Sequence, residues 1–168
     1  MEAPWCGLQA PEVDLQCLVK YLKDNKVTLV YEFGAGVSTQ RMSEAGIIVR
    51  SFETHAEYAG LVNEYFKSLE LNPMPTVSHY VEGPEFMQKV KELPQARVCF
   101  VDGPRGTKEL SRIHSLEAAA LLADTILLHD AQRRGERQSL NRMRTLGWKI
   151  GYLPGAVKRK KIAVLTRS

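Results

Sequence analysis

The sequence predicts an α/β protein with one domain, residues 1–168, and a mostly parallel sheet. At 168 residues the chain can form one hydrophobic core but is short for two domains. Short apolar segments rich in β-branched residues alternate with longer segments that have the periodicity of amphipathic helices. Strands separated by helices are typical of a parallel sheet with helices on both faces.

Each expected element has a local signal in the sequence. A helix is expected at residues 11–25, because Pro11 suits a first turn and the apolar residues share one face: Val13, Leu15, Leu18, Val19 and Leu22. Further helices are expected from about Ser38 and at 56–71, 84–93, 108–123 and 136–147. Strands are expected at 28–33, 46–53, 76–82, 96–102, 125–130, 148–154 and 161–167.

Only residues 155–160, GAVKRK, separate the last two expected strands. A parallel crossover needs roughly a dozen residues, so these strands should form an antiparallel hairpin. We therefore expect a seven-stranded sheet, mostly parallel, with one reversed strand near an edge. The basic run KRKK at 158–161 suits a solvated hairpin tip whose lysines protect an edge strand, and a nucleic-acid patch is the alternative.

The composition indicates a globular protein that does not cross a membrane. The net charge is +4, with 44% hydrophobic and 25% charged residues. The longest apolar run, 116–128, contains Asp124 and is far shorter than the ~20 residues of a membrane span. The chain does not start as a secretory signal does, and Cys6, Cys17 and Cys99 lack the spacing of a metal site. These features predict a cytoplasmic protein in which Cys99 is buried.

Four expected strands end in an acid: Glu32, Glu53, Asp102 and Asp130. Ligands of an open parallel sheet bind beyond the carboxyl ends of its strands, so these side chains should surround a ligand. The glycine turn after the first strand offers Thr39 where a dinucleotide site needs its third glycine. The acids would also repel a pyrophosphate. A ligand with positive charge and a ribose is favoured, with Glu53 as the acid for the ribose.

Four segments resemble the successive strand-end motifs of class I S-adenosylmethionine (SAM)-dependent methyltransferases. They are VYEFGAGVST at 30–39, VRSFETHAEY at 49–58, CFVDGPRG at 99–106 and TILLHDAQR at 125–133. The resemblance extends from about Pro11 to Arg167 and includes the final hairpin. It implies a Rossmann-like methyltransferase fold, SAM as the cofactor and methyl transfer as the reaction.

The resemblance implies roles for the residues after the first strand. Gly34 and Gly36 would let the chain pass under the methionine part of SAM. Glu32 would hold the ammonium group through water, and Ser38 or Thr39 would meet the carboxylate at the helix start. The alternatives are a tight turn for the two glycines and plain helix caps for the two hydroxyl residues.

The same resemblance places the nucleoside part of SAM beside the second and third strands. Glu53 would bind the ribose, and Thr54 and His55 would lie beside the adenine edge. For His55 an ordinary surface histidine is the favoured alternative. Glu82 and Gly83 would flank the adenine.

The group that activates the acceptor is left open. Asp102 would face the sulfonium, where the acceptor arrives, and His129 could act as a general base. Alternatively Asp102 and Asp130 could bind a divalent cation, as acids at these strand ends do in metal-dependent catechol-type methyltransferases. Those enzymes have an amide residue where this chain has Ala131, and Gln132 is the nearest substitute. We therefore assign no metal ligands, and Asp102, His129 and Asp130 are the candidate catalytic residues.

Residues 101–136 also resemble the plant glucuronoxylan O-methyltransferases, which share a VD-P-G turn, an arginine helix and an HD--R--E strand end. This second resemblance implies structural or substrate-facing roles for Arg112, Arg133 and Glu136. An arginine in the pocket would favour an acidic acceptor. The alternative is a solvated helix start, which concerns Arg133, Arg134 and Arg137.

We therefore expect a SAM-dependent methyltransferase that methylates an oxygen of a small molecule or a saccharide. The alternatives are an RNA or protein methyltransferase and a SAM-binding protein without methyl transfer. A nucleic-acid substrate is disfavoured, because DGPR at 102–105 stands where base-methylating enzymes have an NPPY-type turn. A homo-oligomer stays open, since another subunit, or the segment with Trp5 and Cys6, could complete the acceptor pocket.

Overall fold

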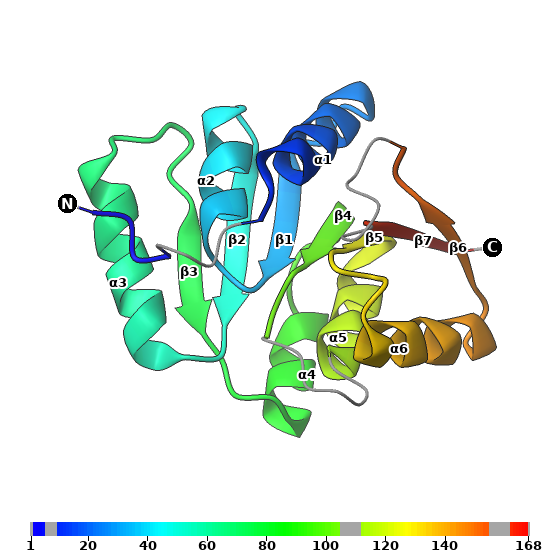
Figure 1. Ribbon diagram of the computed structural model, residues 1–168. Coiled ribbons are helices and arrows are strands. Elements are labelled where there is room, and N and C mark those ends of the chain that lie inside the picture. The colour runs from blue at the N-terminus through cyan, green and yellow to red at the C-terminus, as the bar shows by residue number, and fades with distance from the viewer. Residues whose placement is uncertain (1, 6–9, 105–111, 155–161, 168) are drawn as a thin grey trace.

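Seven strands form one sheet between two layers of helices (Figure 1). The structure is a computed structural model that describes residues 2–5, 10–104, 112–154 and 162–167. The strands are β1 (Leu29–Phe33), β2 (Ile48–Glu53), β3 (Thr76–His79), β4 (Ala96–Val101), β5 (Ala123–Leu128), β6 (Trp148–Tyr152) and β7 (Ala163–Arg167). The helices are α1 (Glu12–Asp24), α2 (Val37–Glu44), α3 (Ala56–Ser68), α4 (Pro84–Lys91), α5 (Ile113–Leu122) and α6 (Arg134–Thr145).

The strand order is β3-β2-β1-β4-β5-β7-β6. β1 pairs in parallel with β2 and β4, so that Val30 lies between Val49 and Val98. β7 is antiparallel to both of its neighbours, β5 and β6. The predicted seven-stranded sheet with a reversed strand in a final hairpin is therefore confirmed. The basic run at 158–161 lies outside the described residues.

The strands bury apolar side chains on both faces, as the continuous hydrophobic runs of the sequence require. On one face α1 and α2 pack against a cluster that includes Val30, Val98 and Leu127. On the other face α4, α5 and α6 pack against a cluster around Phe33 and Ile126. α3 covers the β3 edge on the same side as α1 and α2 (Figure 1).

The structure corrects one detail of α1. Val13 was expected on the buried face but is 46% exposed, while its neighbour Asp14 is only 1% exposed. Asp14, Leu18 and Leu22 follow one another at four-residue intervals, so the acid lies on the same helical stripe as two core leucines. A carboxylate at such a position needs a polar or charged partner.

Other expectations hold with shifted bounds. Cys99 is buried as predicted, and burial raises the pKa of its thiol. β5 begins at Ala123, directly after α5, which is two residues earlier than expected. The expected start of α5 at 108–111 lies outside the described residues. No helix among the described segments is both long enough and apolar enough to span a bilayer.

The loops after β1 and β4 meet backbone to backbone. Gly34 has a φ of +91°, and a Cβ placed on it would lie 2.7 Å from the Cα of Gly103. The carbonyl of Phe33 accepts hydrogen bonds from the N–H groups of Asp102, at 2.9 Å, and Gly103, at 2.6 Å. β2 lies on one side of β1 and β4 on the other, so this contact marks the switch point at which open sheets bind ligands.

We predict that Gly34→Ala destabilises the protein much more than Gly46→Ala. Gly46 has a similar φ of +84°, but no atom of the described residues lies within 4 Å of the position of a Cβ. Both variants would bear the strain of a left-handed residue, about 1–2 kcal/mol. Only Gly34→Ala would also force two backbones apart, which should add about 2 kcal/mol. Urea unfolding of the two variants measures the difference, and equal losses would show that the contact is not tight.

Candidate active site

A cleft of about 620 Å³ opens at the switch point, beyond the carboxyl ends of the strands. One side, the β1–β2 half, is lined by Gly36, Ser38, Glu53, His55 and Tyr58 among others. The other side, the β4–β5 half, is lined by Asp102, Arg112, His129, Asp130 and Arg133 among others. Trp5, which packs against the rings of Tyr65 and Phe66, also borders the cleft. Three of the four predicted strand-end acids, Glu53, Asp102 and Asp130, thus border one cleft.

Glu32 lies behind the β1–β2 half in a cage of hydroxyl groups. Its carboxylate is fully buried and accepts hydrogen bonds from Ser38 at 2.5 Å, from Ser51 at 2.6 Å and from Thr39. Burial raises the pKa of Glu32 to about 7, although the three hydroxyl donors oppose the rise; the charge of Asp102 adds to it. Glu32 therefore takes up a proton at a higher pH than an ordinary glutamate does.

This cage changes what Ser38 and Thr39 can offer a ligand. Each hydroxyl has one proton, and in both residues that proton points to Glu32. Thr39 Oγ1 also accepts a hydrogen bond from the N–H of Gly36, at 2.9 Å. The hydroxyl of Ser38, which borders the cleft, thus presents lone pairs and suits a cationic donor better than a carboxylate.

Glu53 borders the cleft directly. Its Oε1 accepts hydrogen bonds from the N–H of His55, at 3.0 Å, and from the hydroxyl of Thr54, at 3.3 Å. Its Oε2 accepts one from the N–H of Ala35, at 3.3 Å. A carboxylate has about four lone-pair sites, so this anchored group keeps room for a further donor. His55 also caps α3, because its Nδ1 accepts a hydrogen bond from the N–H of Tyr58 at 3.2 Å.

The β1–β2 half has a negative potential. Burial, with the charges of Glu53 and Glu32, raises the pKa of the Tyr58 hydroxyl to about 12. The same potential would attract a positively charged ligand group and repel a phosphate. The hydroxyl oxygen of Tyr58 lies 3.7 Å from where a Cβ on Gly36 would be, so this part of the glycine turn has space for one more methyl group.

His129 forms the centre of the β4–β5 half. Its Nδ1 lies 2.9 Å from Asp102 Oδ1, and its Nε2 lies 3.1 Å from Asp14 Oδ2. Burial alone would lower the pKa of His129, but the hydrogen bonds and charges of the surrounding acids outweigh burial and raise it. A carboxylate at each of the two nitrogens favours the imidazolium form of the ring, which donates twice. This arrangement leaves no lone pair on His129, and so it does not support His129 as the general base.

Asp102 is held in the ionised state. Burial alone would raise its pKa, but the hydrogen bond from His129 and the positive charges of His129, Arg112 and Arg133 hold the pKa below its ordinary value. The Asp102 side chain is 25% exposed, and it borders the cleft. Asp130 is almost fully buried with a φ of +56°, and its Oδ1 has no hydrogen-bond partner among the described residues. A strained, partly unsatisfied acid of this kind is typical of functional sites.

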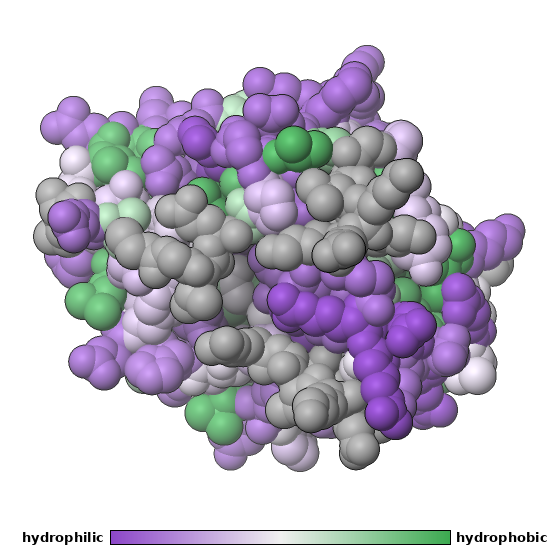
Figure 2. All heavy atoms as spheres, viewed as in Figure 1, coloured by the Kyte–Doolittle hydropathy of each residue, from purple (hydrophilic) through white to green (hydrophobic). Residues whose placement is uncertain are grey.

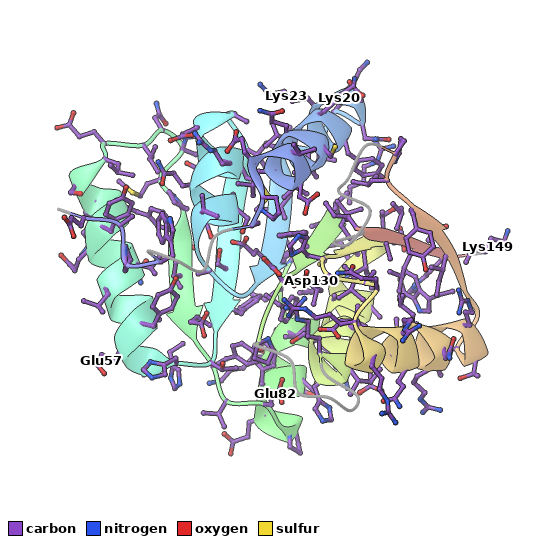
Figure 3. The ribbon with its side chains drawn as sticks, viewed as in Figure 1. Lys20, Lys23, Glu57, Glu82, Asp130 and Lys149 are labelled. Carbon is purple, nitrogen blue, oxygen red and sulfur yellow. The ribbon has the colours of Figure 1, made fainter. Side chains whose placement is uncertain are left out.

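Two sequence-predicted residues lie apart from this cleft. Glu82 is exposed and, with Gly83, borders a separate hollow beside α4 that also includes His114. Figure 3 shows Glu82 near α4 and Asp130 close to the ends of the central strands. Glu82 and Gly83 do not line the cleft, and their contact with an adenine stays a prediction.

The sequence interpretation missed Asp14 as a site residue. Asp14 lies in α1, 115 positions from His129, and its carboxylate is the second partner of the imidazole. The available signal was its position on the apolar stripe of α1, where an acid is out of place. Arg112 and Glu136 are both buried, and burial favours a structural role over a substrate-facing one for these two residues.

The arginines at the start of α6 divide between solvent and site. Figure 2 shows hydrophilic residues gathered over this region, and Arg133, Arg134 and Arg137 are all exposed. Arg133, however, also lies 2.6 Å from Asp130 Oδ2 and borders the cleft. The solvated alternative therefore describes Arg134 and Arg137 better than Arg133.

Solved structures of methyltransferases share this architecture. The O-methyltransferase from Bacillus cereus in complex with SAH has a TM-score of 0.73 at 14% identity, over 96% of this chain and 84% of that chain. The O-methyltransferase TomG from Streptomyces achromogenes, in complex with SAM, has a TM-score of 0.72 at 10% identity, over 97% and 83%. Magnesium protoporphyrin IX methyltransferase from Synechocystis PCC 6803, with bound SAM, has a TM-score of 0.61 at 18% identity, over 98% and 88%.

This chain has the class I methyltransferase fold. The predicted fold is confirmed over nearly the whole chain, because the matched structures cover almost all of it. No model of a known protein family matches the sequence, and no curated protein matches it. The structural similarity establishes the methyltransferase fold, and sequence identities this low leave the acceptor open.

We predict that Glu32→Gln becomes more stable relative to the wild type as pH rises. The folded-state pKa of about 7 is above the ordinary 4.5, so the folded protein binds this proton more tightly than the unfolded chain. Stability from this group is complete below the lower value and is lost as pH rises through the higher one. Glutamine does not titrate, so the difference in unfolding free energy should grow by about 3 kcal/mol between about pH 4.5 and pH 8.

Urea unfolding at several pH values measures this difference. Glu57→Gln is the control, because Glu57 is exposed on α3 (Figure 3). A Glu32→Gln curve that runs parallel to the wild-type curve would show that Glu32 has an ordinary pKa.

Proposed function

We propose that this protein is a SAM-dependent methyltransferase that acts on an oxygen of a small-molecule or saccharide acceptor. The observation that carries the proposal is the position of Glu53. Its carboxylate borders the cleft at the switch point of a methyltransferase fold, anchored by the N–H groups of Ala35 and His55. An acid at the end of the second strand of such a fold can accept hydrogen bonds from both hydroxyl groups of a ribose.

The rest of the β1–β2 half suits the methionine part of SAM. The cofactor has a sulfonium and an ammonium group, and this half contains two acids held by hydroxyl and backbone N–H donors. The ammonium group would donate to the hydroxyl oxygen of Ser38, which is polarised by its own hydrogen bond to the Glu32 carboxylate. The cofactor carboxylate would then meet the N–H groups at the start of α2 rather than the hydroxyls of Ser38 and Thr39.

The β4–β5 half would receive the acceptor. Methyl transfer to a hydroxyl is an in-line displacement: the acceptor oxygen forms a bond to the methyl carbon while the carbon–sulfur bond breaks. The oxygen becomes far more acidic as that bond forms, so even a carboxylate with a lowered pKa can take its proton. Asp102, partly exposed in the cleft, is the proposed acceptor of this proton, and His129 would position its carboxylate. Asp130 would lie beside the acceptor.

The proposal is tested in two steps. Calorimetry with SAM and with its demethylated product should show binding to the purified protein at one site per chain. Candidate acceptors are then incubated with SAM that has a labelled methyl group, and Asp102→Asn should lower the transfer rate at least about 100-fold. A protein that binds neither form of the cofactor would contradict the proposal.

Trp5 offers a direct signal for ligand binding. The chain has two tryptophans, and only Trp5 borders the cleft, while Trp148 lies on β6 beside Arg167. A Trp148→Phe variant therefore contains a single fluorescent reporter next to the proposed cofactor site. Binding in the cleft should change its emission.

We predict that Glu53→Gln weakens SAM binding at least about tenfold. The amide cannot accept two charge-assisted hydrogen bonds from a ribose, and each such bond contributes about 1.5–3 kcal/mol. The matched control is again Glu57→Gln, four residues further along the chain, because Glu57 is exposed in the first turn of α3. Calorimetric affinities that are equal for Glu53→Gln and the control would refute the ribose contact.

We predict that Gly36→Ala folds normally but loses at least about tenfold in affinity for SAM. Gly36 is in an extended conformation, with a φ of 167°, and its new methyl group would meet the protein only at an ordinary contact distance. A close approach between backbone and ligand leaves no room for that methyl group. Thermal unfolding and calorimetry separate the two effects, and unchanged affinity would place the ligand elsewhere in the cleft.

A further inference from the structure

Three groups of the β4–β5 half could at first sight hold a metal ion. Asp102, His129 and Asp130 each offer one ligand atom, and these atoms all lie within 4.8 Å of one another. Oxygen-rich sites of this size suit Mg²⁺ or Mn²⁺. Whether a cation fits depends on what already neutralises these acids.

Arg112 already occupies the space beside both acids. Its Nη1 lies 3.5 Å from Asp102 Oδ1, and its Nη2 lies 4.0 Å from Asp130 Oδ2. The guanidinium is held in place, because it also donates to the carbonyls of His129, at 2.9 Å, and Pro104, at 3.2 Å. Its Nε lies 3.6 Å from the buried carboxylate of Glu136. The Arg112 side chain is only 3% exposed, so it does not have free space into which it could withdraw.

Both ring nitrogens of His129 and one carboxylate oxygen of Asp130 are engaged as well. A histidine binds a metal through a lone pair, yet both ring nitrogens of His129 face carboxylates, Asp102 at 2.9 Å and Asp14 at 3.1 Å. Asp130 Oδ2 lies 2.6 Å from Arg133 Nη2. A cation bound through His129 and this oxygen of Asp130 would have to displace a proton and an ion pair at the same time.

The charges of the cluster are already nearly balanced. Among the described residues, four carboxylates meet three cationic groups, which leaves one negative charge: Asp14, Asp102, Asp130 and Glu136 against Arg112, Arg133 and His129. A Mg²⁺ bound at about 2.1 Å from Asp102 Oδ1 would lie within about 6 Å of the Arg112 guanidinium. Repulsion between the two cations at low dielectric would be strong.

We infer that the guanidinium of Arg112 is the resident counter-ion of Asp102 and Asp130 and takes the place of a divalent cation. The inference rests on the proposed function only in naming this half as the acceptor end. Arg112 is then a positioning residue: it keeps Asp102 ionised and holds both acids in place beside the acceptor. The donor set does not fit a metal, so the acceptor is activated by protein groups alone.

Titration with Mn²⁺ tests this inference, because the EPR signal of the free ion disappears when the ion binds. In the wild-type protein the EPR signal of free Mn²⁺ should stay proportional to the total Mn²⁺ added, which means that no ion binds. This result is expected with and without the demethylated cofactor product. Arg112→Met removes the guanidinium and keeps a long side chain that is unbranched at Cβ. The left-handed backbone of residue 112 should therefore be about as favourable in the variant as in the wild type. This variant should bind one Mn²⁺ at least tenfold more tightly than the wild type, and the added change Asp130→Asn should abolish that binding.

Arg137→Met is the matched control, because Arg137 is exposed on α6. It should leave Mn²⁺ binding as in the wild type. Stoichiometric binding by the wild type that is lost in Asp130→Asn would overturn the inference, and this comparison decides it even where Arg112→Met does not fold. A folded Arg112→Met that stays without Mn²⁺ would also overturn it, since something other than the guanidinium would then exclude the ion. Calorimetry with SAM on the same samples reports separately on the proposed function.

Discussion

The contact between Gly34 and Gly103 is the constraint on which the rest of the site depends. Neither residue has a side chain, so the loops after β1 and β4 can meet backbone to backbone at the switch point of the sheet. The carbonyl of Phe33 then receives two N–H groups from the end of β4. This close approach sets the two halves of the cleft at a fixed separation. A ligand that spans them meets the acids of β1 and β2 at one end and those of β4 and β5 at the other.

The two halves differ in how their acids are compensated. Glu32 and Glu53 are held by hydroxyl and backbone N–H groups, which are neutral donors. Asp102 and Asp130 are held by Arg112, Arg133 and an imidazolium. The first half therefore keeps negative charge that a cationic ligand can use, whereas the second is balanced within the protein. Such a division suits a cleft in which the cofactor is cationic and the acceptor is not required to be.

Local patterns were enough to predict the strands, the hairpin and the strand-end acids. The reason is physical: period and turn chemistry are properties of short segments, and the carboxyl ends of parallel strands lie together by topology. What local patterns could not supply is pairing across the chain. Asp14 contacts His129, which lies 115 positions away in the sequence. Arg112 has a left-handed backbone conformation, with a φ of +67°, just before α5. Its side chain contacts the loop after β4, the loop after β5 and helix α6. Asp102 and Asp130 were considered from the sequence as ligands of a shared cation, and the structure places the guanidinium of Arg112 beside both acids.

Glu32 lies in β1 and Asp102 directly follows the neighbouring strand β4, yet the groups around the two acids act on their charges in opposite ways. Hydroxyl groups both donate and accept, so the cage of Ser38, Thr39 and Ser51 can satisfy Glu32 whether it is neutral or ionised. A guanidinium only donates, so Arg112 stabilises the ionised form of Asp102 alone. A cage of arginines around Glu32 would have cancelled the charge that the glycine turn presents. The hydroxyl cage leaves that charge to be set by the ligand: an ammonium group would favour the ionised acid, and a phosphate would find it in the way. This is why a glycine turn that resembles a phosphate loop can begin with a buried acid.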